Sequence, residues 1–378
     1  MKICLLNVLH DALDKRMYHK VARSLVAAGH EVVSIAPGTG AAPDGEGGVR
    51  FISVPEALSF AARFWSVARL ARLGRRERAD LYIAPEPESW VAALVIKMTG
   101  GGKVVLDMHE HIPSEFAKFF PACFRGIVAW LTLRFMRLFA RFTDLIILTR
   151  DSFDVFWTGL KTPRVTVINT NHLQPQCASI PEFLKDAYAS RPTLIHQGIF
   201  GDIRGSYQLL EAMKQVAVEL PDIRCIVLGR YAYGDESAYR RAIRDAGLEQ
   251  HIVLLDAVPY EQVPAYIAVA RIGLILFQPG LPNHTLAMPH KLFDYMREAK
   301  PVIAPAFSIE VSRIVGEADC GILVDITSPD AIAGAVLELL RDSEKAARLG
   351  QNGRRAVEEK YNWQQDERRL IEAINRLE

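Results

Sequence analysis

Cysteine is scarce in this chain of 378 residues, and its few copies are scattered. The five cysteines stand at positions 4, 123, 177, 225 and 320, and neither their spacing nor their odd number is typical of a metal site or a disulfide framework. This distribution excludes a disulfide-stapled secreted scaffold. It predicts a cytoplasmic protein that holds no metal.

An excess of charge of one sign is also missing, because the formal net charge is only +1. Without a global positive field, the sequence predicts no nucleic-acid partner. Long apolar runs are missing too: the uncharged apolar run at 126–133 is far shorter than the ~20 residues that cross a bilayer. No secretory leader is evident before the first strand-like segment, so we expect a soluble or peripheral protein.

The first turn of the chain lacks the G-x-G-x-x-G fingerprint, which argues against a Rossmann-type dinucleotide site in the N-terminal half. What the half does contain is a regular alternation of short apolar runs and amphipathic segments, typical of a parallel α/β sheet. The expected strands are 2–8, 31–36, 51–54, 81–84, 103–107, 145–149 and 165–169. The expected helices are 15–28, one starting at 55, 90–98 and a long apolar stretch before 145.

The alternation stops at 169–191, which is predicted to be a linker, and then starts again. The second set of expected strands is 193–196, 224–229, 252–256, 272–277, 301–304 and 321–324. The second set of expected helices is 206–220, 235–246, 261–268, 289–297, 310–315 and 330–341, before a nearly all-helical tail at 343–378. Because ligands of such sheets bind beyond the carboxyl ends of the strands, two facing domains would hold theirs in the cleft between them.

The stretch 272–305 combines a buried strand with a helix start at Pro289, whose missing N–H costs nothing in a first turn. Free N–H groups and the helix dipole favour an anion there, and Lys291 adds a positive charge. Asp294 shares the helix face of Lys291, where a ribose diol is a suitable partner. We therefore predict a nucleotide-diphosphate site at His290, Lys291, Leu292 and Asp294. The alternative is an ordinary strand-loop-helix unit with a solvated Asp294.

A glycine-rich loop at 197–206 forms a second candidate phosphate contact. Gly198 and Gly205 would let the backbone approach a ligand closely, and Arg204 would clamp a diphosphate with its planar fork. Gly229 and Arg230 follow another strand and complete the predicted donor-binding set. The alternative is a flexible turn whose arginine is solvated.

In the N-terminal half, polar residues gather at the end of the strand 103–107. Asp107 and His109 alternate onto one face at the carboxyl end of that strand, where catalytic groups sit in such folds, and Glu110 follows. A further set after the first strand would line the same edge; it consists of His10, Asp14 and Arg16. The alternative for His109 is a structural histidine at a strand end.

Two arginine-rich stretches, 62–78 and 116–142, combine basic and apolar residues, and the second holds no acidic residue. Arg69, Arg72 and Arg76 share one helix face, and Arg134, Arg137 and Arg141 share another. Basic amphipathic helices of this kind lie on anionic lipid, so we predict an anionic membrane surface as a partner. The alternative is two ordinary amphipathic helices with their apolar faces in the domain core.

Together, these residues resemble the family-4 retaining glycosyltransferases (group 1) of the GT-B fold. The family's donor loop matches Gly198, Arg204, Gly205, Leu209 and Ala212. Its second donor motif matches Pro289, Lys291, Asp294, Tyr295, Pro301, Val302, Ile303 and Ala304. Its ending matches Gly321, Leu323, Val324, Tyr361 and Trp363, and its N-terminal Asp-x-His-Glu matches Asp107, His109 and Glu110. The resemblance covers nearly the whole chain and is strongest over 194–363.

The resemblance implies two Rossmann-like parallel-sheet domains, 1–172 and 173–360, facing each other across a cleft. It also implies a final helix, 361–378, that crosses back to the first domain. The second domain would hold a nucleotide diphosphate sugar, with UDP or GDP as the favoured carriers, and no metal or other cofactor is required. The first would hold the acceptor, expected to be a glycan or lipid-linked saccharide of cell-surface polysaccharide synthesis at the cytoplasmic face of the inner membrane.

The roles that follow are also implied by the resemblance. Arg204 and Lys291 would neutralise the departing diphosphate, and Asp294 would hold the ribose. His109 would sit by the reacting centre, with Asp107 orienting it or the acceptor.

The sequence departs from the family at Leu286, where the first of two family glutamates would stand. This departure leaves two alternatives open. A nucleotide-sugar 2-epimerase of the same fold would need acid/base carboxylates where Leu286 stands. A non-catalytic nucleotide-sugar-binding or scaffold protein would need no carboxylates at that position.

Overall fold

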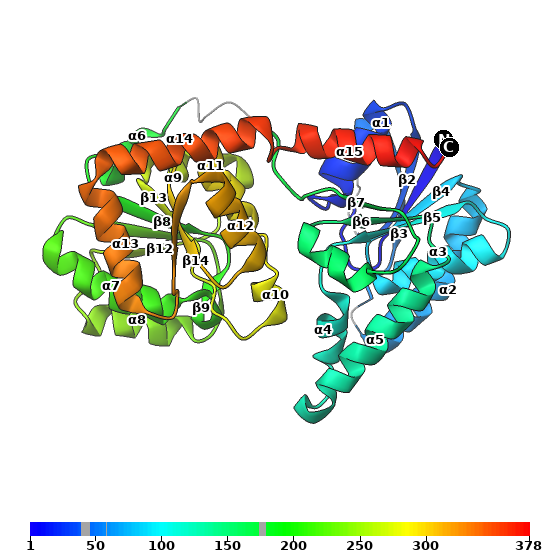
Figure 1. Ribbon diagram of the computed structural model, residues 1–378, viewed down its shortest axis with the longest axis horizontal. Helices are drawn as coiled ribbons and strands as arrows, with labels where there is room; N and C mark the ends of the chain where they lie inside the picture. Colours follow the sequence, from blue (N-terminus) through cyan, green and yellow to red (C-terminus); the bar gives the residue numbers. More distant parts are fainter. Residues whose placement is uncertain (39–45, 58, 174–178) are drawn as a thin grey trace. The chain divides into compact units, whose positions relative to one another are not determined.

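The computed structural model describes residues 1–38, 46–57, 59–173 and 179–378, which form two compact units (Figure 1). Unit 1 comprises Met1–Asn169 and Trp363–Glu378, and unit 2 comprises Thr170–Asn362. Each unit is built on its own parallel sheet, as the alternation predicts. Position 177, one of the five cysteines, and part of the predicted linker lie outside the described residues.

The sheet of unit 1 has the order β3-β2-β1-β4-β5-β6-β7, with every neighbouring pair parallel. Its strands are β1 Lys2–Leu6, β2 Glu31–Pro37, β3 Val49–Val54, β4 Leu81–Ala84, β5 Lys103–Met108, β6 Leu145–Leu148 and β7 Arg164–Thr166. Central residues such as Ile3, Ile83 and Val105 are fully buried, as expected of strands covered on both faces. This arrangement places the ends of β1, β4 and β5 side by side.

The helical segments of unit 1 include a π-helix and three 3₁₀ segments. They are η1 Met17–Ala22, α1 Arg23–Ala27, η2 Glu46–Gly48, α2 Phe60–Glu77, α3 Pro87–Met98, α4 Ile112–Ala117, η3 Ala122–Phe124, α5 Arg125–Ala140, η4 Asp151–Trp157 and α15 Trp363–Asn375. The helix expected at 55 starts five residues later, because the Ser59 side chain accepts a hydrogen bond from the Ala62 N–H and caps it there.

The last helix, α15, packs into the core of unit 1 although it is distant in sequence. Trp363, Leu370 and Ile374 are fully buried there. The indole Nε1 of Trp363 donates to Ser24 Oγ at 3.1 Å, and Asp366 Oδ1 accepts from the Ile168 N–H at 3.1 Å. The C-terminal segment therefore completes unit 1.

The main sheet of unit 2 has the order β12-β10-β8-β13-β14-β15, and a small sheet pairs β11 with β9. The strands are β8 Thr193–Gln197, β9 Phe200–Gly201, β10 Arg224–Leu228, β11 Tyr231–Tyr233, β12 Ile252–Leu255, β13 Ile272–Leu274, β14 Val302–Pro305 and β15 Gly321–Val324. The helical segments are α6 Glu182–Leu184, η5 Lys185–Ala189, η6 Asp202–Arg204, α7 Ser206–Glu219, α8 Glu236–Asp245, η7 Tyr260–Gln262, α9 Val263–Val269, α10 Pro282–Thr285, α11 His290–Arg297, α12 Ile309–Ala318, α13 Pro329–Arg341 and α14 Ser343–Glu359.

Unit 2 differs from the sequence expectation in several places, among them the short helix α10 at Pro282–Thr285. The predicted linker contains α6 and η5, and the short pair β9 and β11 was too brief to predict. Strand β13 ends at Leu274, although residues 275–277 stay buried. Pro289 is the residue that precedes α11 rather than part of its first turn, since its ψ of 137° is extended. None of the helices formed by the described residues is both long and apolar enough to cross a membrane.

Candidate functional site

The candidate donor site of unit 2 is built where the backbone after β8 approaches the backbone after β10. At Gly229, whose φ is 141°, a Cβ would lie 2.3 Å from the Gly198 carbonyl oxygen. At Gly205, whose φ is 84°, a Cβ would lie 2.4 Å from the Leu276 carbonyl oxygen. Only glycine fits such left-handed, crowded positions, and the N-terminus of α7 begins directly after Gly205. The predicted glycines therefore shape this loop.

Two basic residues, Lys291 and Arg204, lie near a neutral histidine, His196, beside this loop. Lys291 Nζ lies 3.0 Å from His196 Nε2, and Lys291 contacts the space that a Cβ of Gly198 would occupy. Burial, with the charge of Arg204, lowers the pKa of Lys291 to about 7. Burial and the charge of Lys291 likewise hold the pKa of His196 well below its ordinary value. The site is therefore electropositive and gains stability from any anion that enters it.

Arg204 supports the same conclusion. Its Nε is buried and has no hydrogen-bond partner among the described residues. Its guanidinium carbon lies 5.7 Å from the Tyr233 ring centroid, which holds the planar fork in place. A buried N–H donor without a partner is costly, so this group is suited to a ligand that accepts from it. The alternative of a solvated arginine does not describe this environment.

The other predicted donor residues are placed differently. His290 is half-buried in the first turn of α11, and Arg230 is exposed. Leu292 is fully buried, so its side chain packs in the core and only its backbone could meet a ligand. A donor contact through the backbone of Leu292 stays a prediction.

Asp294 is neither solvated nor open to a ligand, because its side chain is only 1% exposed. Its Oδ1 accepts hydrogen bonds from Asn171 Nδ2 at 2.7 Å and Tyr260 Oη at 2.5 Å. Its Oδ2 accepts from Gln197 Nε2 at 2.6 Å, and Arg297 Nη2 lies 3.6 Å from Oδ1. The observed contacts make Asp294 the hub of a buried polar network. The solvated alternative is therefore wrong, and the ribose contact stays a prediction that these contacts do not support.

The network around Asp294 joins residues that sequence reasoning missed. Gln197 ends β8, Asn171 follows the first unit, and Tyr260 begins η7. No periodicity or motif indicates these three residues, because their shared partner, Asp294, is distant in sequence and only the fold brings them together. Their effect is to tie the glycine-rich loop to the helix that carries Lys291.

In unit 1, the predicted Asp107 and His109 come together as expected from alternation. His109 Nε2 lies 3.1 Å from Asp107 Oδ2. Arg16 holds the same carboxylate with two hydrogen bonds, from Nε at 3.0 Å and from Nη2 at 2.8 Å, and its Nε also reaches His109 Nε2 at 3.1 Å. Burial alone would raise the pKa of Asp107, but the charges of Arg16 and His109 outweigh it and hold that pKa well below its usual range.

Two predicted acceptor-side residues, Arg16 and Asp14, are engaged by other groups of unit 1. Arg16 is 3% exposed and serves Asp107, so its side chain does not line the edge. Asp14 Oδ1 accepts from the backbone N–H groups of Arg16 at 2.8 Å and Met17 at 2.7 Å, and so caps η1. Glu110, also predicted on the acceptor side, is exposed and lies two residues beyond the end of β5. Asp107 likewise is fully buried, and its carboxylate contacts Arg16 and His109.

Glu86 is the residue at this edge that the sequence prediction missed. It is 4% exposed, follows β4, and its Oε1 lies 2.6 Å from His10 Nδ1. Burial alone would lower the pKa of His10, but the hydrogen bond to Glu86 and its charge raise it. The signal was present in the sequence: Glu86 precedes Pro87 and stands three residues before Ser89, the spacing of a helix-capping pair.

The arginine-rich stretches form α2 and the segment from α4 to α5. On α5, only Met136 and Ala140 are buried, so most of the apolar face of this helix is not packed into the core. The large exposed side chains are Phe64, Trp65, Phe119, Phe120, Phe124, Ile127, Trp130, Leu131, Phe135, Leu138 and Phe142. Several of the arginines are already engaged: Arg63 pairs with Glu88 at 2.7 Å, Arg137 donates to two carbonyl groups, and Arg125 donates to the Phe120 carbonyl oxygen at 3.1 Å.

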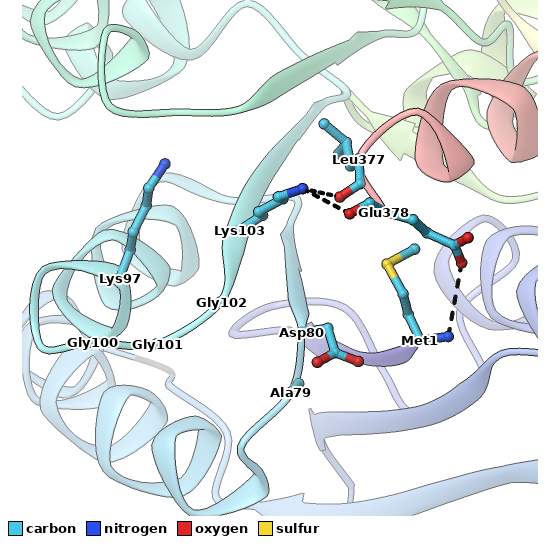
Figure 2. A pocket seen from close by; sticks show the side chains of 10 residues that line it. All are labelled: Met1, Ala79, Asp80, Lys97, Gly100, Gly101, Gly102, Lys103, Leu377 and Glu378. Carbon is cyan, nitrogen blue, oxygen red and sulfur yellow. Dashed lines mark hydrogen bonds and ion pairs between the residues drawn. The ribbon is translucent and has the colours of Figure 1, made fainter.

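One more hollow lies at the opposite edge of unit 1, where β4 and β5 begin (Figure 2). Its volume is about 780 Å³, and Asp80, Lys97, Lys103 and Gly100–Gly102 line it. Lys103 donates to the carbonyl oxygens of Leu377 and Glu378, so this cation is already engaged. Because the polar clusters lie at the carboxyl ends of the strands, this hollow is separate from them. Among the described residues, no group of three or more His, Cys, Asp or Glu is placed to hold a metal ion.

Both halves of the chain match families of known proteins. Residues 187–356 match the family described as glycosyl transferases group 1, and residues 15–168 match the glycosyl transferase 4-like domain. A GDP-mannose-dependent alpha-(1-6)-phosphatidylinositol monomannoside mannosyltransferase of Mycolicibacterium smegmatis is 26% identical over 188 residues, which cover 49% of this chain and 48% of that protein. The chain thus spans about half the length of the curated relatives it matches.

Solved structures show the same fold over the whole length. Sucrose-phosphate synthase from Thermosynechococcus elongatus gives a TM-score of 0.76 at 16% identity, covering 100% of this chain and 99% of that one. Anabaena HepE in complex with UDP-glucose also gives 0.76 at 16% identity, covering both chains completely. The two parallel-sheet units are those of a GT-B fold, and the chain belongs to the group 1, or family-4, glycosyltransferases.

Proposed function

We propose that this protein transfers a hexose-type sugar from a nucleoside diphosphate sugar to a hydroxyl acceptor, with retention of configuration. The observation that carries the proposal is the pair of cations, Lys291 and Arg204, at the starts of α11 and α7 beside a glycine loop that admits a ligand. Negative charge builds on the departing diphosphate in the transition state. Cations fixed at that point lower the barrier because they need not reorganise.

A small pocket next to the glycine loop suits the rest of the nucleotide. Its volume is about 270 Å³, and it adjoins Gly229 and Arg230. Phe200, Tyr231 and Asp256 also line it, offering ring faces and a polar group. We propose UDP or GDP as the carrier, since the similar Anabaena protein was solved with UDP-glucose and the mycobacterial relative is described as GDP-mannose-dependent.

The acceptor is proposed to bind unit 1 at the carboxyl edge that holds His10 and His109. In a front-face retaining mechanism the leaving phosphate takes the proton of the acceptor hydroxyl, so no separate base is needed. The histidines then serve to bind and orient the acceptor oxygen.

Turnover tests the proposal against a non-catalytic binder and against an epimerase. Thermal-shift screening of a panel of nucleoside diphosphate sugars should first identify the donor. The sugar nucleotides of the panel should then each be incubated with the full chain and vesicles of total cell lipid. We expect release of nucleoside diphosphate that requires the sugar nucleotide, the vesicles and the protein. Binding without release would favour the scaffold alternative, and conversion of the donor into its 2-epimer would favour the other.

We further propose that an anionic membrane is a partner and that the acceptor is lipid-linked. The exposed aromatic face of α5 carries Trp130 at 54% and Phe135 at 58% exposure, with Arg134 stacked on Trp130 at 5.0 Å. Exposed apolar area of this extent marks an interaction surface in a soluble protein. The adjoining arginines and the absence of acidic residues at 116–142 fit an anionic lipid surface.

Vesicle flotation tests the membrane proposal. The variant Trp130→Ser with Phe135→Ser should lose most binding to anionic vesicles, whereas Val218→Ser, which changes an 81% exposed residue of unit 2, should not. The wild type should bind less as salt is raised, because exposed charges are screened beyond ~8 Å at physiological ionic strength. Equal binding of all three proteins, or binding to neutral vesicles that salt does not weaken, would contradict the proposal.

A further inference from the structure

Two histidines at the carboxyl edge of the first sheet are each backed by a buried carboxylate. His10 lies against Glu86 and His109 lies against Asp107. Their ring centroids are 5.1 Å apart, in an edge-to-face arrangement. Only the second pair is part of the family motif that the sequence shows.

Glu86 is committed to the loop that carries His10. Its carboxylate accepts hydrogen bonds from the backbone N–H groups of Val8, Leu9 and His10, the shortest being 2.9 Å from Leu9. It also accepts from the Ser89 hydroxyl at 2.8 Å. These bonds fix both the main chain after β1 and the carboxylate itself, so the direction of the His10 imidazole is fixed as well.

The two histidines differ in which nitrogen is left for a ligand. Nε2 of His109 already contacts Asp107 and Arg16. In His10 it is Nδ1 that contacts Glu86, at 2.6 Å, and its side chain is 25% exposed. A carboxylate on Nδ1 orients an imidazole and directs Nε2 away from it.

We propose that His10, positioned by Glu86, contacts the acceptor, donating a hydrogen bond from Nε2 to one of its oxygen atoms. This inference rests on the proposed glycosyl transfer. It assigns the acceptor-facing role to His10 rather than His109 and assigns Glu86 as the residue that positions it. The acceptor oxygen can belong to a hydroxyl or to a phosphate, because an imidazolium donates to either.

The charge state of His10 follows from the groups around it. Glu86 after β4, Asp14 before η1 and Asp107 on β5 all favour the imidazolium. Arg16 and His109 lie on the same side but are paired with Asp107. The negative neighbours therefore dominate, and the donor form of Nε2 is retained to higher pH than in a free histidine.

The first test needs no turnover. The pKa of His10 should be measured by NMR in ¹⁵N-histidine-labelled full chain, with His10→Gln used to assign its signals. We expect Glu86→Gln to lower that pKa by about 1 unit or more, since it removes the charge and keeps the shape. Ser89→Ala is the matched control: it removes another partner of Glu86 and should leave the pKa of His10 in place. An unchanged pKa in Glu86→Gln would overturn the positioning role.

The second test is the pH profile of nucleoside diphosphate release with vesicles of total cell lipid. In the wild type, kcat/KM for the lipid should fall as pH rises through the pKa of His10. The fall should move to lower pH in Glu86→Gln and vanish in His10→Gln, while Ser89→Ala keeps the wild-type profile. A fall that stays in place in both His10→Gln and Glu86→Gln would overturn the acceptor contact.

Two further measurements keep the outcomes separable. If Glu86→Gln does not fold, His10→Gln, which changes a partly exposed side chain, still decides the acceptor contact.

Titration with inorganic phosphate and with octyl glucoside, followed at the His10 signals, distinguishes a phosphate from a hydroxyl oxygen. Calorimetry with UDP or GDP reports on the donor site of unit 2 alone. Loss of nucleotide binding would therefore count against the proposed function, whereas a wrong assignment of His10 would leave it intact.

Discussion

Replacing Lys291 or Arg204 with alanine should cost about 2–3 kcal/mol of transition-state stabilisation each, the scale of removing one preorganised donor from a developing anion. Both cations lie beside the glycine loop, and Arg204 Nε is buried without a partner among the described residues. Neither substitution should unfold the protein, because each relieves a buried charge. The measurements are kcat/KM for the sugar nucleotide and the melting temperature of the same preparations.

Lys214→Ala serves as the control, since it removes an exposed cation on α7 that pairs with Glu211. It should leave kcat/KM unchanged. Wild-type donor affinity and turnover in the Arg204→Ala, Lys291→Ala double variant would show that the diphosphate binds elsewhere.

The same site gives the donor affinity a specific pH dependence. The pKa of Lys291 is about 7 in the free protein, because burial and Arg204 disfavour its charge. A bound diphosphate favours the charged amine and raises that pKa. Between the free and bound values, binding takes up a proton, so the affinity of UDP or GDP should fall as pH rises above about 7. Calorimetry in two buffers of different ionisation enthalpy measures the uptake, and Lys291→Ala should abolish it.

Substituting Asp294 is expected to have the largest effect on stability. Three hydrogen-bond donors and the Arg297 guanidinium surround its buried carboxylate. Asp294→Ala leaves these donors without the carboxylate and removes one of the anionic partners of Arg297, which keeps Glu298. Removing one member of a buried charged network costs about 3–5 kcal/mol, so the melting temperature should fall strongly.

The control for this prediction is Glu211→Ala, which removes an exposed carboxylate of the same unit. Such surface pairs contribute roughly 0–1 kcal/mol. If Asp294 were instead a ribose contact, Asp294→Asn would weaken nucleotide binding, keep the wild-type melting temperature, and no longer discriminate against 2′-deoxy and 3′-deoxy nucleotides. A loss of stability with the discrimination retained is the expected result.

The residues that the sequence could place are those whose role is local. Buried parallel strands appear as short apolar runs, so β1, β4 and β8 were predictable. Their carboxyl ends were predictable from strand direction alone, and with them the loops that carry Gly198 and Arg204. Asp107 and His109 could be placed together because side chains two residues apart in a strand share a face.

Other features were decided only by the tertiary structure, because they depend on residues far apart in the chain. Arg16 reaches Asp107 over 91 positions, His10 reaches Glu86 over 76, and Asn171 reaches Asp294 over 123. No spacing rule connects such pairs. The sequence predicts Arg16 on the acceptor side, and the fold makes it a partner of Asp107. It predicts Asp294 as a ribose contact, and the fold makes it the hub of a buried network.

Burial is the other property that the sequence left open. The amphipathic pattern of α5 is the same whether its aromatic face packs on a core or stays exposed, since periodicity gives a direction but not a partner. Only the packing of unit 1 shows that this face, with Trp130 and Phe135, is left uncovered. Likewise, Lys291 was predictable as a cation at a helix start. Its lowered pKa arises from the burial and the Arg204 charge that the fold of unit 2 brings to it.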